Sequence, residues 1–406
     1  MGKNKPKGGA LGGFDQLRAP DAPTISVTVA SEQISVAFTN PSDVGGGAIS
    51  SYTATATASG VSTGATSATS PVTITGLTNG TSYSVTGLAN NAFGASPYSA
   101  ATSSSPVSSR ALFAGGGTIA SFDNLRSIDY IDITSTGNAS DFGDLNQPVS
   151  NGGATASTTR GLFIGGSSWY ESVNGNQVSY VTIGSLGDSQ DFGDLISGSR
   201  YGGACGSSTR ALYSNGAYGV GVGGALSPID YFTIASTGNG TDFGDNTQAS
   251  QGKTAFSSPT RGVFSCGYTT GYTNVMDYVT IASTGNATDF GDNTQTRYLV
   301  AGCSSNTRGL TSGGDASGSG SNVIDYVTIA SSGNATDFGD LTATKSNHRG
   351  TSNSTRGVFA GGYSGGNLNV IEYITIGSTG NATDFGDLTV ARQAGPSGLC
   401  GAHGGI

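Results

Sequence analysis

A block of about fifty residues occurs six times in residues 108–406, and this repetition limits the possible folds more than any other feature of the chain. Each copy contains Thr-Arg or Ser-Arg before a short apolar stretch, with its arginine at Arg110, Arg160, Arg210, Arg261, Arg308 or Arg356 and spacings of 50, 50, 51, 47 and 48 residues. A second motif, DFGD, begins at Asp141, Asp191, Asp242, Asp289, Asp337 and Asp384. A period near fifty with several short strands is typical of β-sheets packed side by side, one sheet per repeat.

Each repeat predicts four strands: an inner strand such as Gly152–Ser157, a second that starts at the repeat arginine, a third such as Val178–Ile183, and an outer strand containing DFGD. The third strand Val323–Ile329 (VIDYVTI) has apolar residues on both of its alternating faces. A strand with one solvent-facing side would alternate apolar and polar residues. We therefore expect both faces to be buried between neighbouring sheets.

The order of the strands predicts how the ends of the repeat region meet. Six sets of second, third and outer strands are separated by only five inner strands, and Gln393–Cys400 matches the missing one. We expect this C-terminal segment to pair with the strand that begins at Arg110. Such pairing would leave no open sheet edge between the two ends of the region.

The double glycine after the second strand and the third-strand pattern Val-Ile-Asp/Glu-Tyr resemble kelch repeats. The kelch tryptophan of the fourth strand is missing, and the phenylalanine of DFGD occupies about its place. The resemblance implies a six-bladed kelch-like β-propeller. The recurring phrase STGNATDFGDLT also resembles repeat proteins of marine (cyanophage-type) bacteriophage virions, which implies a structural or fibre protein of a phage particle.

The preceding region predicts a small all-β module. Strand-like runs between Pro, Gly and Asn occupy residues 20–107, and segments such as ISVAFTNP and ITGLTNGTSYSV resemble a fibronectin type III domain. Leu77–Tyr83 resembles the tyrosine corner of that family, and Phe38 stands where the family usually has a core tryptophan. Residues 1–19, rich in Gly and Lys, predict a flexible anchoring arm, and residues 108–406 the propeller.

Composition excludes several classes of function. Charged residues are only 11% and the net charge is −9, so a nucleic-acid binder is not expected, although Lys3, Lys5 and Lys7 make the arm basic. No apolar run is long enough for a membrane helix, and no secretory signal is evident. Four cysteines without C-x-x-C spacing predict neither a zinc site nor a disulfide framework, and we expect no cofactor and no metal.

The repeated residues predict structural roles. A catalytic group would be expected once, whereas the arginines and DFGD aspartates occur six times, and an arginine fork pairs well with carboxylates. We therefore expect them to be structural anchors that tie the sheets together. Counting back from the repeat arginines places Cys205 and Cys303, and with them Cys400, at one buried position of the inner strands.

The variable connections predict a ligand-binding face. Connections between second and third strands should share one end of the sheets with those between fourth and first strands. Together they hold aromatic and basic residues, from which we select Trp169, Tyr170, Tyr218, Tyr268, Tyr272, Tyr363, Arg200, Arg297 and Arg349 as candidate ligand-binding residues. Aromatic rings suit sugars, and arginines suit anionic groups.

These observations predict a non-enzymatic protein of the virion surface, such as a tail fibre, assembled in the host cytoplasm. The arm and the fibronectin-like domain would contact other virion proteins, and the propeller would adhere to a host surface glycan or protein. One alternative is a capsid decoration or tail-associated protein with protein contacts only. A weaker alternative is a polysaccharide-processing enzyme. Neither nucleic-acid binding nor membrane insertion is expected.

Overall fold

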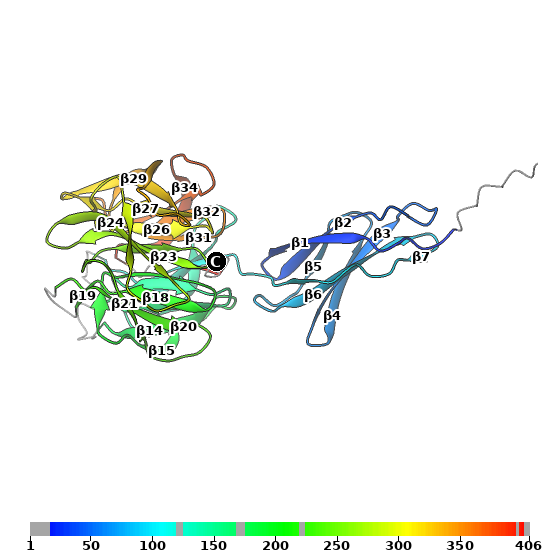
Figure 1. Cartoon of the computed structure of the whole chain (residues 1–406), viewed down its shortest axis with the longest axis horizontal. Helices are drawn as coiled ribbons and strands as arrows, with labels where there is room; N and C mark the ends of the chain where they lie inside the picture. The colour runs from blue at the N-terminus through cyan, green and yellow to red at the C-terminus, as the bar shows by residue number, and fades with distance from the viewer. Residues whose placement is uncertain (1–16, 119–124, 168–174, 219–223, 395–397, 402–406) are drawn as a thin grey trace, which may run out of the picture. The chain divides into compact units, whose positions relative to one another are not determined.

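The structure is a computed structural model that describes residues 17–118, 125–167, 175–218, 224–394 and 398–401 (Figure 1). The described residues form strands, turns and loops, with no helix among them, and therefore none that could span a membrane. The chain folds into two compact units, Met1–Pro106 and Val107–Ile406. The chain is thus all-β, as predicted.

The first unit contains two sheets that enclose an apolar core. One sheet has the order β1 (Thr24–Ala30), β2 (Gln33–Thr39), β5 (Val72–Thr75). The other has β4 (Val61–Ser67), β3 (Ser51–Ala58), β6 (Tyr83–Asn91) and β7 (Gly94–Ala95), with β8 (Thr102–Ser104) also paired to β6. Their inward residues alternate with more exposed ones, as in Ile34 and Val36 of β2 and Ala54 and Ala56 of β3.

The predicted tyrosine corner is confirmed. The Tyr83 hydroxyl accepts a hydrogen bond of 3.0 Å from the backbone N–H of Thr78, while the Tyr83 ring joins the core. Phe38, at the position of the family's usual tryptophan, is only half-buried and packs on Tyr52 with ring centroids 4.8 Å apart. The buried core of this unit therefore consists of aliphatic residues and Tyr83, with Phe38 and Tyr52 packed against it.

The second unit contains six sheets of the same design, in which an inner, a second, a third and an outer strand follow one another. Their strands, in that order, are β35 (Leu399–Cys400), β9 (Arg110–Ala114), β10 (Ser127–Asp132), β11 (Ser140–Asp144); β12 (Gly153–Ala156), β13 (Arg160–Ile164), β14 (Gln177–Thr182), β15 (Gln190–Asp194); β17 (Gly203–Gly206), β18 (Arg210–Ser214), β20 (Pro228–Thr233), β21 (Thr241–Asp245); β22 (Thr254–Ser257), β23 (Arg261–Tyr268), β24 (Tyr272–Thr280), β25 (Thr288–Asp292); β26 (Ala301–Ser304), β27 (Arg308–Ser312), β29 (Ser319–Thr328), β30 (Thr336–Lys345); and β31 (Arg349–Ser352), β32 (Arg356–Ala360), β33 (Leu368–Thr375), β34 (Thr383–Arg392). We number these sheets one to six. Short strands β16 (Ser199–Arg200) and β19 (Ala217–Tyr218) pair with each other, and β28 (Asp315–Ala316) pairs with β29.

The C-terminal strand completes the first sheet. β35 pairs antiparallel with β9, Leu399 opposite Leu112 and Cys400 opposite Ala111. Pairing of the last strand with the strand that begins at Arg110 is therefore confirmed. The register corrects one prediction, because Leu399, not Cys400, is equivalent to Cys205 and Cys303, which lie opposite Leu212 and Leu310.

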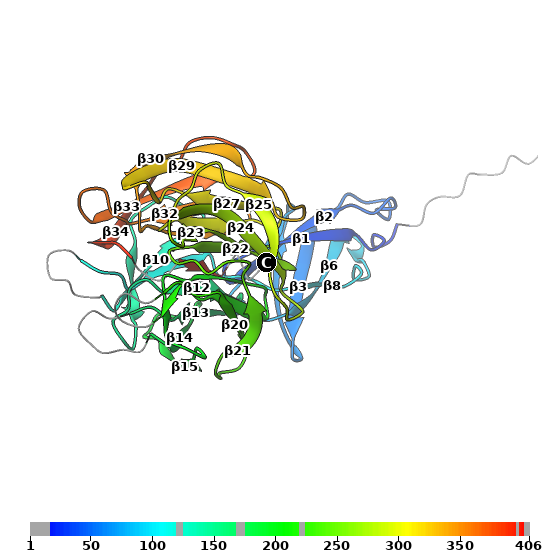
Figure 2. The same cartoon turned by 60° about the vertical axis from the view of Figure 1, so that its left-hand side comes forward.

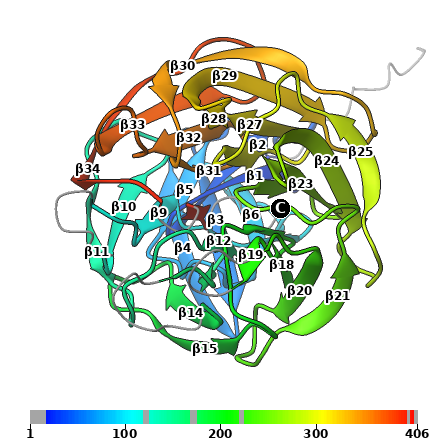
Figure 3. The same ribbon diagram turned by 90° about the vertical axis from the view of Figure 1, so that its left-hand side faces the viewer.

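The six sheets follow one another around a common centre (Figure 3). Inner strands of successive sheets contact each other, and β35 contacts both β12 and β31. A closed ring of backbone hydrogen bonds surrounds this centre. It passes through one residue of positive φ per sheet, namely Asn151, Tyr201, Gly252, Leu299, Asn347 and Ala394. The N–H of each residue donates to the carbonyl of the preceding one, and the N–H of Asn151 donates to the carbonyl of Ala394, which closes the ring. Because Ala394 precedes β35, it is the residue of the first sheet, and its backbone joins Asn347 of the sixth sheet to Asn151 of the second.

The third strands are buried on both faces, as their sequence predicts. In β29, Ile324 packs with Phe338 and Ile374, whereas Val327 of the same strand packs with Phe256 and Phe290. The first set belongs to sheets five and six, and the second to sheets four and five. Figure 2 shows β29 among these neighbouring strands. Apolar residues on both faces of a strand therefore join three successive sheets.

Candidate binding face

The repeat arginines connect each sheet to the next, but not through carboxylates. In all six, Nη1 donates to an isoleucine carbonyl that follows the third strand of the next sheet, as from Arg261 to Ile329 at 2.9 Å and from Arg356 to Ile133 at 2.8 Å. Each guanidinium also lies over the tyrosine of its own third strand, 4.2 Å from the ring centroid for Arg261 and Tyr278. The arginines therefore cross-link neighbouring sheets through a carbonyl and an aromatic ring.

The prediction that the DFGD aspartates pair with these arginines is wrong. The first aspartate of each motif has an exposed side chain, and no ion pair among the described residues joins one to a repeat arginine. These aspartates, which the sequence suggested as anchors, are Asp141, Asp191, Asp242, Asp289, Asp337 and Asp384. The anchoring comes instead from the phenylalanine, the glycine and the backbone of DFGD.

Each DFGD contains a β-bulge that turns its phenylalanine into the core. In the fourth sheet Met276 lies opposite Gly291 and Asp277 opposite Asp289, so Phe290 is the extra residue. Gly291 has φ of +136°, and a Cβ there would lie 2.6 Å from the backbone of Gly333 in the next sheet. Only glycine permits this conformation and this close approach.

The Gly-Asn connections between third and outer strands bind the preceding sheet. Gly333 N–H donates to the Phe290 carbonyl at 2.7 Å, and the Asn334 carboxamide oxygen accepts from Asp292 N–H at 3.0 Å. The same pattern recurs through Asp188, Asn239, Asn286, Asn381 and, from the first sheet to the sixth, Asn138. The outer strand of each sheet therefore gives its free edge to the next sheet rather than to solvent.

The candidate ligand-binding residues that the structure describes lie at one end of the sheets. Because the sheets are antiparallel, second-to-third and fourth-to-first connections emerge together, and we call this end the loop face. Backbone bridges join the two kinds of connection, Gln251 to Tyr268 and Tyr298 to Asp315. The chain enters the unit at the start of β9, the end of that strand opposite the loop face.

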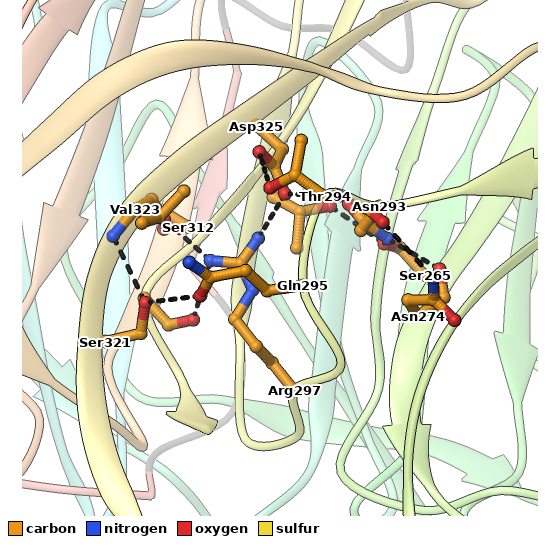
Figure 4. Close-up of polar contacts among 12 residues, drawn as sticks. Ser265, Asn274, Asn293, Thr294, Gln295, Arg297, Ser312, Ser321, Val323 and Asp325 are labelled. Carbon is orange, nitrogen blue, oxygen red and sulfur yellow. Dashed lines mark hydrogen bonds and ion pairs between the residues drawn. The ribbon is translucent and has the colours of Figure 1, made fainter. Parts of the chain in front are cut away.

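The structure corrects the prediction that Arg297 is available to a ligand. Its side chain is fully buried, forms a 2.6 Å ion pair with Asp325 of the next sheet, and donates to the carbonyls of Gly313 and Val323 (Figure 4). Thr294 binds the same carboxylate through its N–H and hydroxyl. This guanidinium has no face toward solvent, so it contributes to sheet packing.

Two equivalent buried pairs occupy the next interfaces, Lys345 with Glu372 and Arg392 with Asp129. Between the first and second sheets the equivalent residues are Val149 and Ser179, neither of them charged. At the other two interfaces the equivalent residues are Ser199 with Asp230 and Ser250 with Asp277, and no ion pair among the described residues involves these two buried aspartates. Their carboxylates accept hydrogen bonds instead, that of Asp230 from Ile196 N–H and that of Asp277 from the N–H and hydroxyl of Thr247, because a buried charge needs an ion pair or hydrogen bonds.

The other two candidate arginines are half-buried. Arg200 lies with its guanidinium 5.3 Å from the centroid of the Tyr201 ring. Arg349 donates to the His348 carbonyl, and burial lowers the pKa of Arg349 to about 10, opposed by Tyr201 and Tyr213. The neighbouring His348 is fully buried and its Nε2 lies 2.9 Å from the Ser312 hydroxyl. The loop face is therefore less basic than its sequence suggests.

The structure brings two of the candidate aromatic residues together with one that the sequence analysis did not select. Tyr268 and Tyr272 face each other across the β23–β24 hairpin, with ring centroids 5.6 Å apart. Tyr298, from the following connection, is 5.7 Å from Tyr268 and 5.3 Å from Tyr272. We call these three residues the tyrosine cluster. All three rings are half-buried.

The other predicted aromatics are dispersed. Tyr218 and Tyr363 are 61% and 37% exposed and pack on none of the three rings of the cluster. Trp169 and Tyr170 lie outside the described residues. Tyr298 could have been predicted from the sequence. It follows Arg297 in a fourth-to-first connection, as Tyr201 follows Arg200 in another, whereas the candidate aromatics came from second-to-third connections.

Only a small cavity remains at the centre of the sheets. A cavity of about 60 Å³ is lined by residues of all six inner strands, among them Cys205, Cys303 and Cys400, and has room for a few water molecules at most. Burial raises the pKa of Cys205 to about 12 and raises the pKa of Cys303. In the ranges described above, no group of His, Cys, Asp or Glu is arranged to hold a metal ion. These thiols pack rather than react.

Comparison with known proteins identifies the first unit. The family model of the Fibronectin type III domain matches residues 18–105, which span β1 to β8 and the tyrosine corner. A search of curated proteins gave no match. The chain therefore contains an N-terminal fibronectin type III domain.

Proposed function

We propose that this chain is a surface-adhesion protein of a bacteriophage virion, in which a six-bladed kelch-like propeller presents its loop face to the host. The propeller interpretation is supported by six four-stranded sheets in circular order and by the C-terminal strand that completes the first of them. The phage assignment rests on the resemblance of the repeated STGNATDFGDLT phrase to virion proteins.

One observation carries the binding role. Most residues that recur from repeat to repeat are engaged in contacts between sheets. Examples are the repeat arginine, the DFGD glycine, and the Asn of the Gly-Asn connection, which is replaced by Asp188 in one repeat. Residues that differ between repeats gather at the loop face, where the tyrosine cluster and the exposed Tyr218 lie. A scaffold with one variable, aromatic end is suited to recognition.

The surface of the fibronectin type III domain suits attachment to other virion proteins. Val61, Tyr98 and Phe93 are 71%, 59% and 46% exposed and offer apolar area to a protein partner. The basic arm, with Lys3, Lys5 and Lys7, would add contacts with acidic surfaces of the particle. The same observation favours the second candidate, a decoration or tail-associated protein that makes protein contacts only.

The test uses the full chain, fluorescently labelled, with intact cells of a panel of bacterial strains that includes marine cyanobacteria. Adhesion predicts saturable binding to some strains, competed by unlabelled protein. Antibody labelling of purified particles locates the chain. Firm retention on particles without binding to any strain would refute adhesion and favour the structural role.

A further inference from the structure

We propose that the tyrosine cluster, with Tyr201 and Asp315, is a binding site for an uncharged saccharide. This inference rests on the adhesion role proposed above and specifies the ligand class and the position on the loop face.

The site is assembled by backbone hydrogen bonds from three separate segments. Tyr268 and Tyr272 are held opposite each other by the β23–β24 hairpin. Tyr298 and Asp315 are joined by a pair of backbone hydrogen bonds of 3.1 and 2.8 Å. The positions of the four side chains are therefore set before a ligand arrives, which lowers the entropy cost of binding.

The three rings form a corner rather than a flat platform. Their planes meet at 89° for Tyr268 and Tyr272, 66° for Tyr272 and Tyr298, and 52° for Tyr268 and Tyr298. Aromatic rings that are only half-buried leave apolar area accessible beside their hydroxyl groups. A pyranose ring has the matching composition, with apolar C–H faces and hydroxyls around its edge.

Polar groups at the site match sugar hydroxyls. One oxygen of Asp315 accepts from Gly318 N–H at 2.7 Å, and a carboxylate has further lone pairs for donors. Partial burial and, next, the Asp315 carboxylate raise the pKa of Tyr272 and of Tyr298. Both phenols therefore stay protonated at neutral pH and can donate hydrogen bonds.

The charges at the site favour a ligand without net charge. Asp315 is negative, while Arg200 lies over the Tyr201 ring, which is close enough to Tyr298 to influence its pKa. Arg297, whose sequence position suggested recognition of anions, is fully buried and paired with Asp325. The half-buried guanidinium groups of Arg200 and Arg349 are engaged with the Tyr201 ring and the His348 carbonyl, and Asp315 repels anions, so an acidic sugar gains no clear advantage.

The cluster is not a requirement of the repeat. In sheets four and five the bridges between the two kinds of connection are Gln251–Tyr268 and Tyr298–Asp315. The equivalent bridges in sheets two and six are Ser150–Ser167 and Ser346–Tyr363. Three mutually packed tyrosines therefore occur at one place among the described connections. A group that the sheets needed for stability would recur, as the repeat arginines do.

The experiment is a glycan array carrying neutral and acidic oligosaccharides, probed with the full chain and three variants. Tyr272→Ala removes one ring of the cluster, and Asp315→Asn removes the charge but keeps an oxygen for Gly318 N–H. Leu186→Ala is the control, because Leu186 is a 56% exposed apolar residue of the β14–β15 connection, at the end of the sheets opposite the loop face. Thermal unfolding of each variant verifies folding.

We expect neutral glycans to bind, with affinity about tenfold weaker in Tyr272→Ala, about threefold or more weaker in Asp315→Asn, and unchanged in Leu186→Ala. Equal binding by folded Tyr272→Ala and the parent chain would reject this site but leave adhesion intact. Cell binding without neutral-glycan binding would reject the ligand class. If neither cells nor glycans bind, the adhesion role itself fails.

Discussion

Substituting Arg261 with methionine tests whether the repeat arginines hold neighbouring sheets together. Methionine keeps most of the apolar stem but removes the guanidinium that donates to the Ile329 carbonyl at 2.9 Å and lies 4.2 Å from the centroid of Tyr278. A hydrogen bond from a charged donor contributes about 1.5–3 kcal/mol, and a partly exposed cation–π contact about 0.5–1 kcal/mol. We expect the free energy of unfolding to fall by about 3 kcal/mol.

The assay is calorimetric unfolding of the full chain. For a unit of about 300 residues, an unfolding entropy of about 2.1 cal/mol/K per residue converts that loss to a decrease in Tm of about 5 °C. Arg126→Met is the matched control: Arg126 also donates to a backbone carbonyl, that of Asn146 at 3.0 Å, but this hydrogen bond is exposed. Its loss should cost less than about 0.5 kcal/mol. Equal decreases in Tm for the two variants would refute the cross-link between sheets.

Three further predictions follow from the packing of the sheets. Gly291→Ala should destabilise the second unit by about 2–4 kcal/mol, because φ is +136° and the new Cβ would meet Gly333, whereas Gly137→Ala, with no atom within 4 Å, should be near neutral in chemical denaturation. Arg297→Val should lower the free energy of unfolding by about 3–5 kcal/mol, because it leaves Asp325 buried without its partner. Adding Asp325→Ser reproduces the uncharged Val149 and Ser179 of another interface and should recover part of the lost stability. A double variant no more stable than the single variant would contradict this. Burial lowers the pKa of Lys253 to about 7. Above that pH the folded state has released a proton, whereas the unfolded chain keeps this proton up to about the ordinary lysine pKa of 10.5, so the free energy of unfolding should rise with pH in this window by up to about 1.4 kcal/mol per pH unit. The Tm of Lys253→Met, measured from pH 7 to 9.5, should therefore rise less than that of the parent chain.

The repeat pattern was sufficient to predict the strands and the partner of the last one. Alternation along a strand reports how many of its faces are buried, so Ile324 and Val327 identified a strand covered on both sides. Counting repeats identified a missing inner strand, and β35 indeed pairs with β9. Its register was misjudged by one residue, because Cys400 was grouped with Cys205 and Cys303 by residue type. Counting would not have corrected this, since Ala394 and Leu399 are five residues apart whereas the equivalent Asn347 and Thr351 are four apart.

Only the tertiary structure decided what the polar side chains contact. Sequence spacing suggested that Arg261 binds a DFGD carboxylate and that Arg297 is exposed, whereas the first binds a carbonyl of the next sheet and the second a buried aspartate. Tyr298 was likewise joined to Tyr268 and Tyr272 only by folding. Periodicity is a property of one strand and can be seen in its sequence. The partner of a long polar side chain lies on another sheet, and the packing between sheets determines which atoms come within hydrogen-bonding distance.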